Sequence, residues 1–355
     1  MTTGQQDVDT QTLASNPDFQ LIKTLFNYPR LRENLWQVQA DSPHSYVETL
    51  DSEYQVPTDQ ALAFLPIRSH CTGYNSLAEI EQRSGVPETD VLSILLCLAQ
   101  AGITLPGKAL SAAPDVTPEL VRDKLQRISA IWSRELSREF VANELLGGDL
   151  PKTVLLGWLL EMYHYVRDFP QAIAHGAACA SGELQHLLAR YAAEETGHEN
   201  FVLQTLVNLG LKEEEVKESR PLVSTRLIAF LLRELFELEP AAVLLVAAVV
   251  EAQDVPADKL DEFQARLEYR HALPAGAMKP YFQHQAIDAS LGHSQLLAEN
   301  IKLFQVHDIE TLDKIVDKLH DLKHAFELQS QEIKMYYGEL TGKYFPRQAV
   351  TFSTL

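Results

Sequence analysis

Helical periodicity is the feature that most constrains the fold of this chain. Between Glu119 and Tyr337, apolar residues recur at three- and four-residue intervals, and glycines or prolines separate the periodic segments. Strand-like alternation of any consequence is not seen after residue 106. Helices with one apolar face bury it against one another, so this part is predicted to be an all-α bundle. The predicted helices span residues 119–146, 151–180, 187–211, 224–239, 241–252, 258–271, 278–304 and 309–337. The second of them runs from residue 151 to 165 and continues to about residue 180 after a break or kink expected at Phe169-Pro170.

The part of the chain before this bundle is more mixed. Residues 1–17 are polar and are predicted to be a disordered tail, and one or two helices are expected in residues 18–56. The spacing of Ser76 and Glu79 is that of a capping box, which predicts a helix over residues 77–83. A turn, a helix over residues 88–101 and a strand near residues 103–105 follow.

This helix–turn–helix–strand order resembles a winged helix, so residues 18–115 are predicted to form a winged-helix-like docking region. A bundle domain over residues 119–345 follows it. The second helix of the motif carries Glu88 and Asp90 and no basic residue, which is unfavourable for DNA binding.

Composition narrows the classes of partner. The formal net charge of −19 argues against nucleic acid and against anionic membrane surfaces. The three cysteines are widely spaced and indicate no disulfide framework, as expected for a reducing cytoplasm. Residues 1–17 lack the apolar core of a signal peptide, and the longest apolar run, residues 241–250, is too short to cross a bilayer. A cytoplasmic protein without membrane or nucleic-acid partners is therefore expected.

Two of the predicted helices carry a Glu-x-x-His pair. Glu195 and His198 are three residues apart, which places both side chains on one side of a helix. Glu161 and His164 have the same spacing on an earlier helix. Such pairs hold iron or manganese inside helical bundles. One pair alone is a weak signal, because a surface glutamate with a nearby histidine is commoner than a metal site.

A third helix adds further ligand types. His284 and Asp288 are one turn apart, and His293 lies five residues beyond Asp288. A straight helix would rotate His293 off that face, but Gly292 allows a kink that brings it back. Glu251 ends an apolar run, so it is either solvated at a helix end or paired, protonated or metal-bound in the interior.

Carboxylates and imidazoles without a thiolate suit iron or manganese better than structural zinc. Several carboxylates in one place favour two ions, because their charge needs neutralising and a carboxylate can bridge. Each pair taken singly could instead be an exposed intrahelical pair or a hydrogen-bonded couple. The coincidence of three such groups in one predicted bundle favours a metal centre.

The order of these motifs resembles the haem-oxygenase-like di-iron oxidases and oxygenases, also called iron-containing redox enzymes. The local strings that fit are residues 160–164, 194–199 and 284–288, and the resemblance covers about residues 119–340. It implies a haem-oxygenase-like seven-helix bundle. The family commonly places its last histidine three residues after the aspartate, where this chain has Leu291. The ligands implied are Glu161, Glu195, His198, His284, Asp288 and His293, with Glu251 as an additional one.

The resemblance also implies a function. Two Fe(II) ions, with manganese as an alternative, and O2 as co-substrate would make the protein a non-haem di-iron oxidase or oxygenase. Its substrate would be a small molecule, an amino acid or a group tethered to a carrier or peptide. An electron donor and a homodimer are compatible with this interpretation. Four tyrosines are near enough in sequence to line a pocket, although core packing is their commoner role: Tyr163, Tyr165, Tyr191 and Tyr281.

Two alternatives remain open. A ferritin-like iron protein would use the pairs Glu161/His164 and Glu195/His198 and would not need His284. A metal-free binding protein or hydrolase of the haem-oxygenase fold would commonly use a reactive cysteine, for which Cys179 is the candidate.

Overall fold

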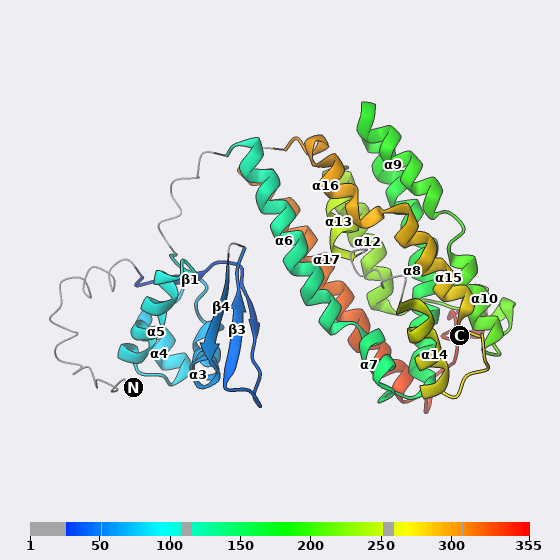
Figure 1. The fold of residues 1–355 in the computed structure, drawn as a ribbon, viewed down its shortest axis with the longest axis horizontal. Coiled ribbons are helices and arrows are strands. Elements are labelled where there is room, and N and C mark those ends of the chain that lie inside the picture. The colour runs from blue at the N-terminus through cyan, green and yellow to red at the C-terminus, as the bar shows by residue number, and fades with distance from the viewer. Residues whose placement is uncertain (1–25, 51, 108–115, 251–258, 307) are drawn as a thin grey trace. The chain divides into compact units, whose positions relative to one another are not determined.

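The computed structural model describes residues 26–50, 52–107, 116–250, 259–306 and 308–355. The chain separates into two compact units, residues 1–115 and 116–355, which are described separately (Figure 1). The predicted disordered tail, residues 1–17, lies outside the described residues, and so does Glu251.

In its described residues, the N-terminal unit combines two small sheets with three helices. Strand β2 pairs with β3 and β3 with β4, all antiparallel, while β1 pairs antiparallel with β5. Its elements are β1 Pro29–Leu31, β2 Leu35–Gln37, β3 His44–Glu48, β4 Glu53–Pro57, α3 Thr58–Arg68, α4 Leu77–Ser84, α5 Glu88–Gln100 and β5 Thr104–Pro106. The core includes Phe64, Ile67, Leu77, Ile80 and Leu95.

The expectation of helices within residues 18–56 is wrong for the described part, which forms strands β1 to β4. These strands have three to five residues each, too few for a periodic pattern to be recognised. Their partners also lie elsewhere in the chain, since Arg30 in β1 is paired with Leu105 in β5. The later part was predicted correctly: Ser76 Oγ accepts from Glu79 N at 3.3 Å, and the Glu79 carboxylate accepts from Ser76 N at 2.7 Å.

In the second unit every described element is helical, which confirms the all-α prediction. The long helices run alongside one another as a bundle (Figure 1). The elements are α6 Pro118–Glu139, α7 Val141–Gly147, α8 Lys152–Cys179, α9 Gly182–Glu195, α10 Glu199–Asn208, α11 Glu213–Glu218, α12 Val223–Leu238, α13 Ala242–Val250, α14 Leu260–Arg270, α15 Lys279–Leu291, η3 His293–Gln295, α16 Leu296–Asn300, η4 Ile301–Leu303, α17 Ile309–Gly338 and η5 Phe352–Thr354. None of the helices in the described ranges is both long and apolar enough to cross a membrane.

Three helices predicted as continuous are broken in the structure. The segment 119–146 divides at Phe140, whose backbone is extended, into α6 and α7. The segment 187–211 divides at Gly197 and the segment 278–304 at Gly292, both of which have a positive φ that ends a helix. Conversely, α8 continues through Pro170, where a break or kink was expected. These breaks matter because two of them fall beside predicted metal ligands.

Helix α8 is the centre of the bundle and packs against α9, α10, α12 and α17. Buried positions occur on all sides of it, as expected for a helix surrounded by others. Helix α13 is composed only of alanine, valine and leucine, and almost all of its residues are buried. The predicted ligands on α8 therefore lie in the interior of the unit.

The crossing of α8 and α17 depends on the absence of a side chain at Gly157. A Cβ atom there would lie 2.1 Å from the ring of Tyr337. We expect Gly157→Ala to lower the free energy of unfolding by about 3 kcal/mol, because neither packed helix can move freely away. Gly338→Ala is the matched control, since its Cβ would lie 3.9 Å from Val154. Chemical denaturation of both variants tests this, and equal stability of the two would contradict the packing described.

Candidate metal centre

The break between α9 and α10 positions the first Glu-x-x-His pair. Helix α9 ends at Glu195, Gly197 turns the chain, and His198 precedes α10. Glu195 and His198 are both buried, and Glu195 Oε2 lies 3.4 Å from His198 Nδ1. The pair therefore faces the interior, as the sequence predicts, although a turn rather than a continuous helix holds it there.

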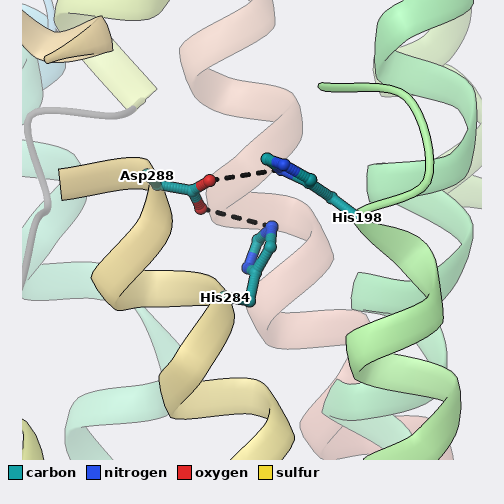
Figure 2. A group of neighbouring side chains, drawn as sticks. All are labelled: His198, His284 and Asp288. Atoms are coloured by element: carbon teal, nitrogen blue, oxygen red, sulfur yellow. Dashed lines mark ion pairs between the residues drawn. The ribbon is translucent and has the colours of Figure 1, made fainter. Parts of the chain in front are cut away.

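Helix α15 places His284 and Asp288 beside His198. His284 Nε2 lies 3.2 Å from Asp288 Oδ2, one turn along the helix. The other carboxylate oxygen, Asp288 Oδ1, lies 3.2 Å from His198 Nδ1. Figure 2 shows Asp288 between the two imidazoles, with His198 coming from the opposite segment. One possible ligand atom from each of these three residues lies within 4.8 Å of the others.

The kink predicted at Gly292 is present. Helix α15 ends at Leu291, Gly292 has a φ of 69°, and His293 begins η3. The turn places His293 Nδ1 2.8 Å from Glu195 Oε1 and His293 Nε2 3.3 Å from Glu194 Oε2. His293 therefore contacts the carboxylates of α9 and extends the cluster by way of Glu195. It is not one of the three residues whose ligand atoms converge.

These three residues fit a metal ion by their unsatisfied buried atoms. Several of their ring and carboxylate atoms are buried and make no well-aligned hydrogen bond to the described residues, although His198 Nδ1 and His284 Nε2 each lie 3.2 Å from an oxygen of Asp288. A buried polar atom without a partner is costly, and a bound cation would satisfy all three residues together. Two imidazoles and one carboxylate form a donor set typical of non-haem Fe(II). The three residues therefore fit iron, and could hold manganese with the same atoms.

Glu161 is held by a different set of partners. Its Oε2 accepts from Leu222 N at 2.9 Å and from Thr225 Oγ1 at 2.6 Å, and its Oε1 accepts from Tyr337 OH at 2.7 Å. Gln329 donates in turn to Thr225 Oγ1. Burial raises the pKa of Glu161, while these hydrogen bonds act in the opposite direction. We call this set of contacts the Glu161 network; its donors already occupy both carboxylate oxygens, and the role of Glu161 as a ligand stays a prediction.

The other Glu-x-x-His pair does not form one site. His164 Nε2 lies 2.9 Å from Ser219 Oγ, whereas Glu161 is bound by the donors of its own network. Burial, followed by the charges of Arg167 and Arg220, lowers the pKa of His164 to about 3. His164 is thus a neutral core histidine that is hydrogen-bonded to a serine through Nε2, while its Nδ1 has no hydrogen-bond partner among the described residues.

A cavity of about 370 Å³ adjoins the candidate centre. Glu161, Glu195, His284 and Asp288 all contribute to its wall. The remaining wall is mainly apolar and comes both from α8, which carries Glu161, and from helices without a predicted ligand, including α6, α7 and α17. Among these lining residues are Phe140, Trp158, Met162, Phe169, Phe326 and Ile333. Of the four candidate pocket tyrosines, Tyr165 and Tyr281 line the cavity, and Tyr163 and Tyr191 do not.

Comparison with known proteins agrees with this geometry. Residues 156–321 match the family described as "Iron-containing redox enzyme". The resemblance inferred from the ligand motifs is confirmed. The matched segment begins within α8 and ends within α17, and it contains the three converging residues.

One solved structure shows the same fold, and two others have lower similarity. A domain of unknown function with a heme oxygenase-like fold from Shewanella denitrificans OS217 is 20% identical, with a TM-score of 0.50 over 63% of this chain and 96% of that one. A TenA homolog from Pseudomonas syringae pv. tomato is 10% identical, with a TM-score of 0.47 over 63% of this chain and 98% of that one. A TenA homologue from P. horikoshii OT3 is 16% identical, with a TM-score of 0.43 over 60% and 97%. No curated protein sequence matches the chain.

The affinity of this chain for a divalent metal is expected to rise with pH. In the metal-free protein, the carboxylates of Asp288 and Glu195 raise the pKa of His198 to about 9, whereas burial lowers the pKa of His284. An imidazole must be neutral to bind a metal, so binding near neutral pH releases the proton of His198. We expect the Mn(II) affinity to rise about tenfold between pH 7 and pH 8, measured by calorimetric titration. Equal affinities at the two pH values would contradict this.

Proposed function

We propose that the protein is an O2-dependent non-haem iron oxidase or oxygenase. The observation that carries the proposal is the convergence of His198, His284 and Asp288, with unsatisfied buried atoms, beside a cavity. Iron bound there would supply one-electron exchange with O2, which amino-acid side chains cannot provide. The family match supports the choice of iron over a structural metal.

The residues around the centre have separate tasks in this proposal. His284 and Asp288, one turn apart on α15, would hold the ion on one side, and His198 would complete the set from the start of α10. Phe169 and Phe326 line the cavity and would exclude water from it, because their rings offer water no strong polar partner. The Glu161 network fixes α8 against α12 and α17 and so preserves the shape of the cavity.

A second ion, as the resemblance implies, would bind between Glu195 and His293. Their present contact is short, at 2.8 Å, so the pair would have to open to admit an ion. Burial raises the pKa of Glu195, but His198 and His293 outweigh it and lower the pKa to about 2. Glu195 is therefore an ionised carboxylate in the metal-free protein and is available to a cation. We propose the His198–His284–Asp288 position as the first to fill.

The volume of the cavity and the charge of its lining residues restrict the kind of substrate that would fit. Its volume of about 370 Å³ is in the lower part of the range for small-molecule sites. None of its lining residues is lysine or arginine, and three are carboxylates. A neutral or cationic molecule with an apolar body fits this wall better than a phosphate or a free carboxylic acid. A substrate carried on a peptide or carrier protein, and an external electron donor, remain part of the proposal.

Iron content and oxygen consumption test the function. After anaerobic addition of Fe(II) and removal of excess metal, we expect at least one iron per chain and consumption of O2 on exposure to air. Asp288→Asn should abolish both and keep the helical fold, because it retains the shape of the side chain. Less than one iron per chain in the wild type, or full iron content in Asp288→Asn, would reject the proposal.

A further inference from the structure

Helices α12 and α17 expose a set of large apolar side chains that no described residue covers. The set, called here the α12–α17 stripe, consists of Val223, Leu227, Phe230, Leu328 and Met335. Their exposed fractions run from 38% for Leu227 to 71% for Met335. The three residues of α12 are four and three positions apart, so they share one face of that helix. Leu328 and Met335 are seven apart and share one face of α17.

The two faces adjoin, because α12 and α17 lie side by side and antiparallel. Ser224 N donates to Glu332 Oε2 at 2.8 Å near the start of α12. Gln329 donates to Thr225 at 2.8 Å, and Lys318 pairs with Glu234 at 2.6 Å towards the other end. This register places Leu328 and Met335 at the level of the first turns of α12. The stripe is therefore one continuous apolar surface and not two separate ones.

A second exposed apolar feature begins at the end of this stripe. Residues 348–355 contain no charged side chain, and Val350, Phe352 and Leu355 are 82%, 92% and 90% exposed. We call this segment the apolar arm. Its base is fixed beside the start of α12, since Arg220 N donates to Arg347 O at 2.8 Å and the Arg347 guanidinium donates to Pro221 O. The arm thus starts next to Val223.

We propose that two copies of this chain form a dimer in which each apolar arm lies on the α12–α17 stripe of the other copy. Within one chain the arm and the stripe are neighbours, yet both remain exposed, so the contact is not made internally. A two-fold axis close to the base of the arm would place each arm on the opposite stripe, and each copy supplies both halves of the contact. Because the arm has no charged side chain, it loses less hydration than a charged segment would when Val350, Phe352 and Leu355 bind an apolar face.

Sedimentation velocity on the full chain tests the dimer. The wild type should sediment as a dimer. Phe352→Asp, which changes only the arm, and Phe230→Asp, which changes only the stripe, should each weaken the dimer at least about 100-fold by placing a charge in the contact. Tyr269→Asp is the matched control, because this tyrosine is 85% exposed on α14 and lies outside the stripe. It should remain dimeric.

Mixing the two defective variants distinguishes a dimer in which the arms are exchanged between copies from a dimer formed through any other surface. A chain with Phe230→Asp keeps its arm, and a chain with Phe352→Asp keeps its stripe, so a mixed pair retains one intact contact. Association should therefore return on mixing, although neither variant associates alone. A monomeric wild type, or a Phe352→Asp variant that dimerises as the wild type does, would overturn the proposal. Iron content does not enter these measurements, so their outcome is independent of the proposed function.

Discussion

Replacing His284 by alanine should lower the affinity of the protein for Mn(II) or Fe(II) by about 100-fold or more. His284 supplies one of three ligand positions; its Nδ1 has no partner among the described residues, and its Nε2 lies 3.2 Å from Asp288 Oδ2 without making a well-aligned hydrogen bond. Removing a ligand lowers the metal affinity more than removing an outer-shell contact does, and the loss of an outer-shell contact alone lowers that affinity about 10- to 100-fold. Titration of free Mn(II), followed by its EPR signal, gives the affinity directly.

His164→Ala is the control for that experiment. His164 is equally buried and belongs to a Glu-x-x-His pair, but it is hydrogen-bonded to Ser219 and stands apart from the converging residues. We expect it to bind metal with an affinity close to that of the wild type. A ferritin-like centre built on the two Glu-x-x-His pairs predicts the reverse, namely loss of metal in His164→Ala and retention in His284→Ala. The pair of variants therefore decides between the two architectures.

Replacing Glu161 by alanine should lower the free energy of unfolding of the metal-free protein by about 3–5 kcal/mol. The change leaves three buried donors without an acceptor, at Leu222 N, Thr225 Oγ1 and Tyr337 OH, and also opens a void in α8. Tyr337→Phe removes only one of these donors and should lower the free energy of unfolding by about 1 kcal/mol. Urea unfolding in the presence of a chelator measures both. A loss below 1 kcal/mol in Glu161→Ala would mean that the network contributes little.

The sequence predicts some parts of the site well because they are local. The spacing of His284 and Asp288 places them together on any helix, and the glycine at 292 marks the turn that redirects His293. The same reasoning locates the capping box at Ser76. Each of these features depends on residues a few positions apart, for which helix geometry is sufficient.

Other parts could not be predicted, because they depend on contacts between distant segments. The partners of Glu161 come from α12 and its N-cap residue Leu222 and from α17, up to 176 residues away, and no local pattern indicates them. The short strands of the N-terminal unit are likewise stabilised by their pairing partners. The apolar wall of the cavity looks in the sequence like ordinary helix core, since packing and pocket use the same residue types.

The most direct test of the central claim is pulsed EPR of Mn(II) bound to the full chain. Nitrogen nuclei of coordinated imidazoles give couplings that report how many histidines hold the ion. With His198, His284 and Asp288 as ligands, the account predicts couplings from two histidine nitrogens, with one of them lost in His284→Ala. A bound Mn(II) without histidine nitrogen couplings would contradict it.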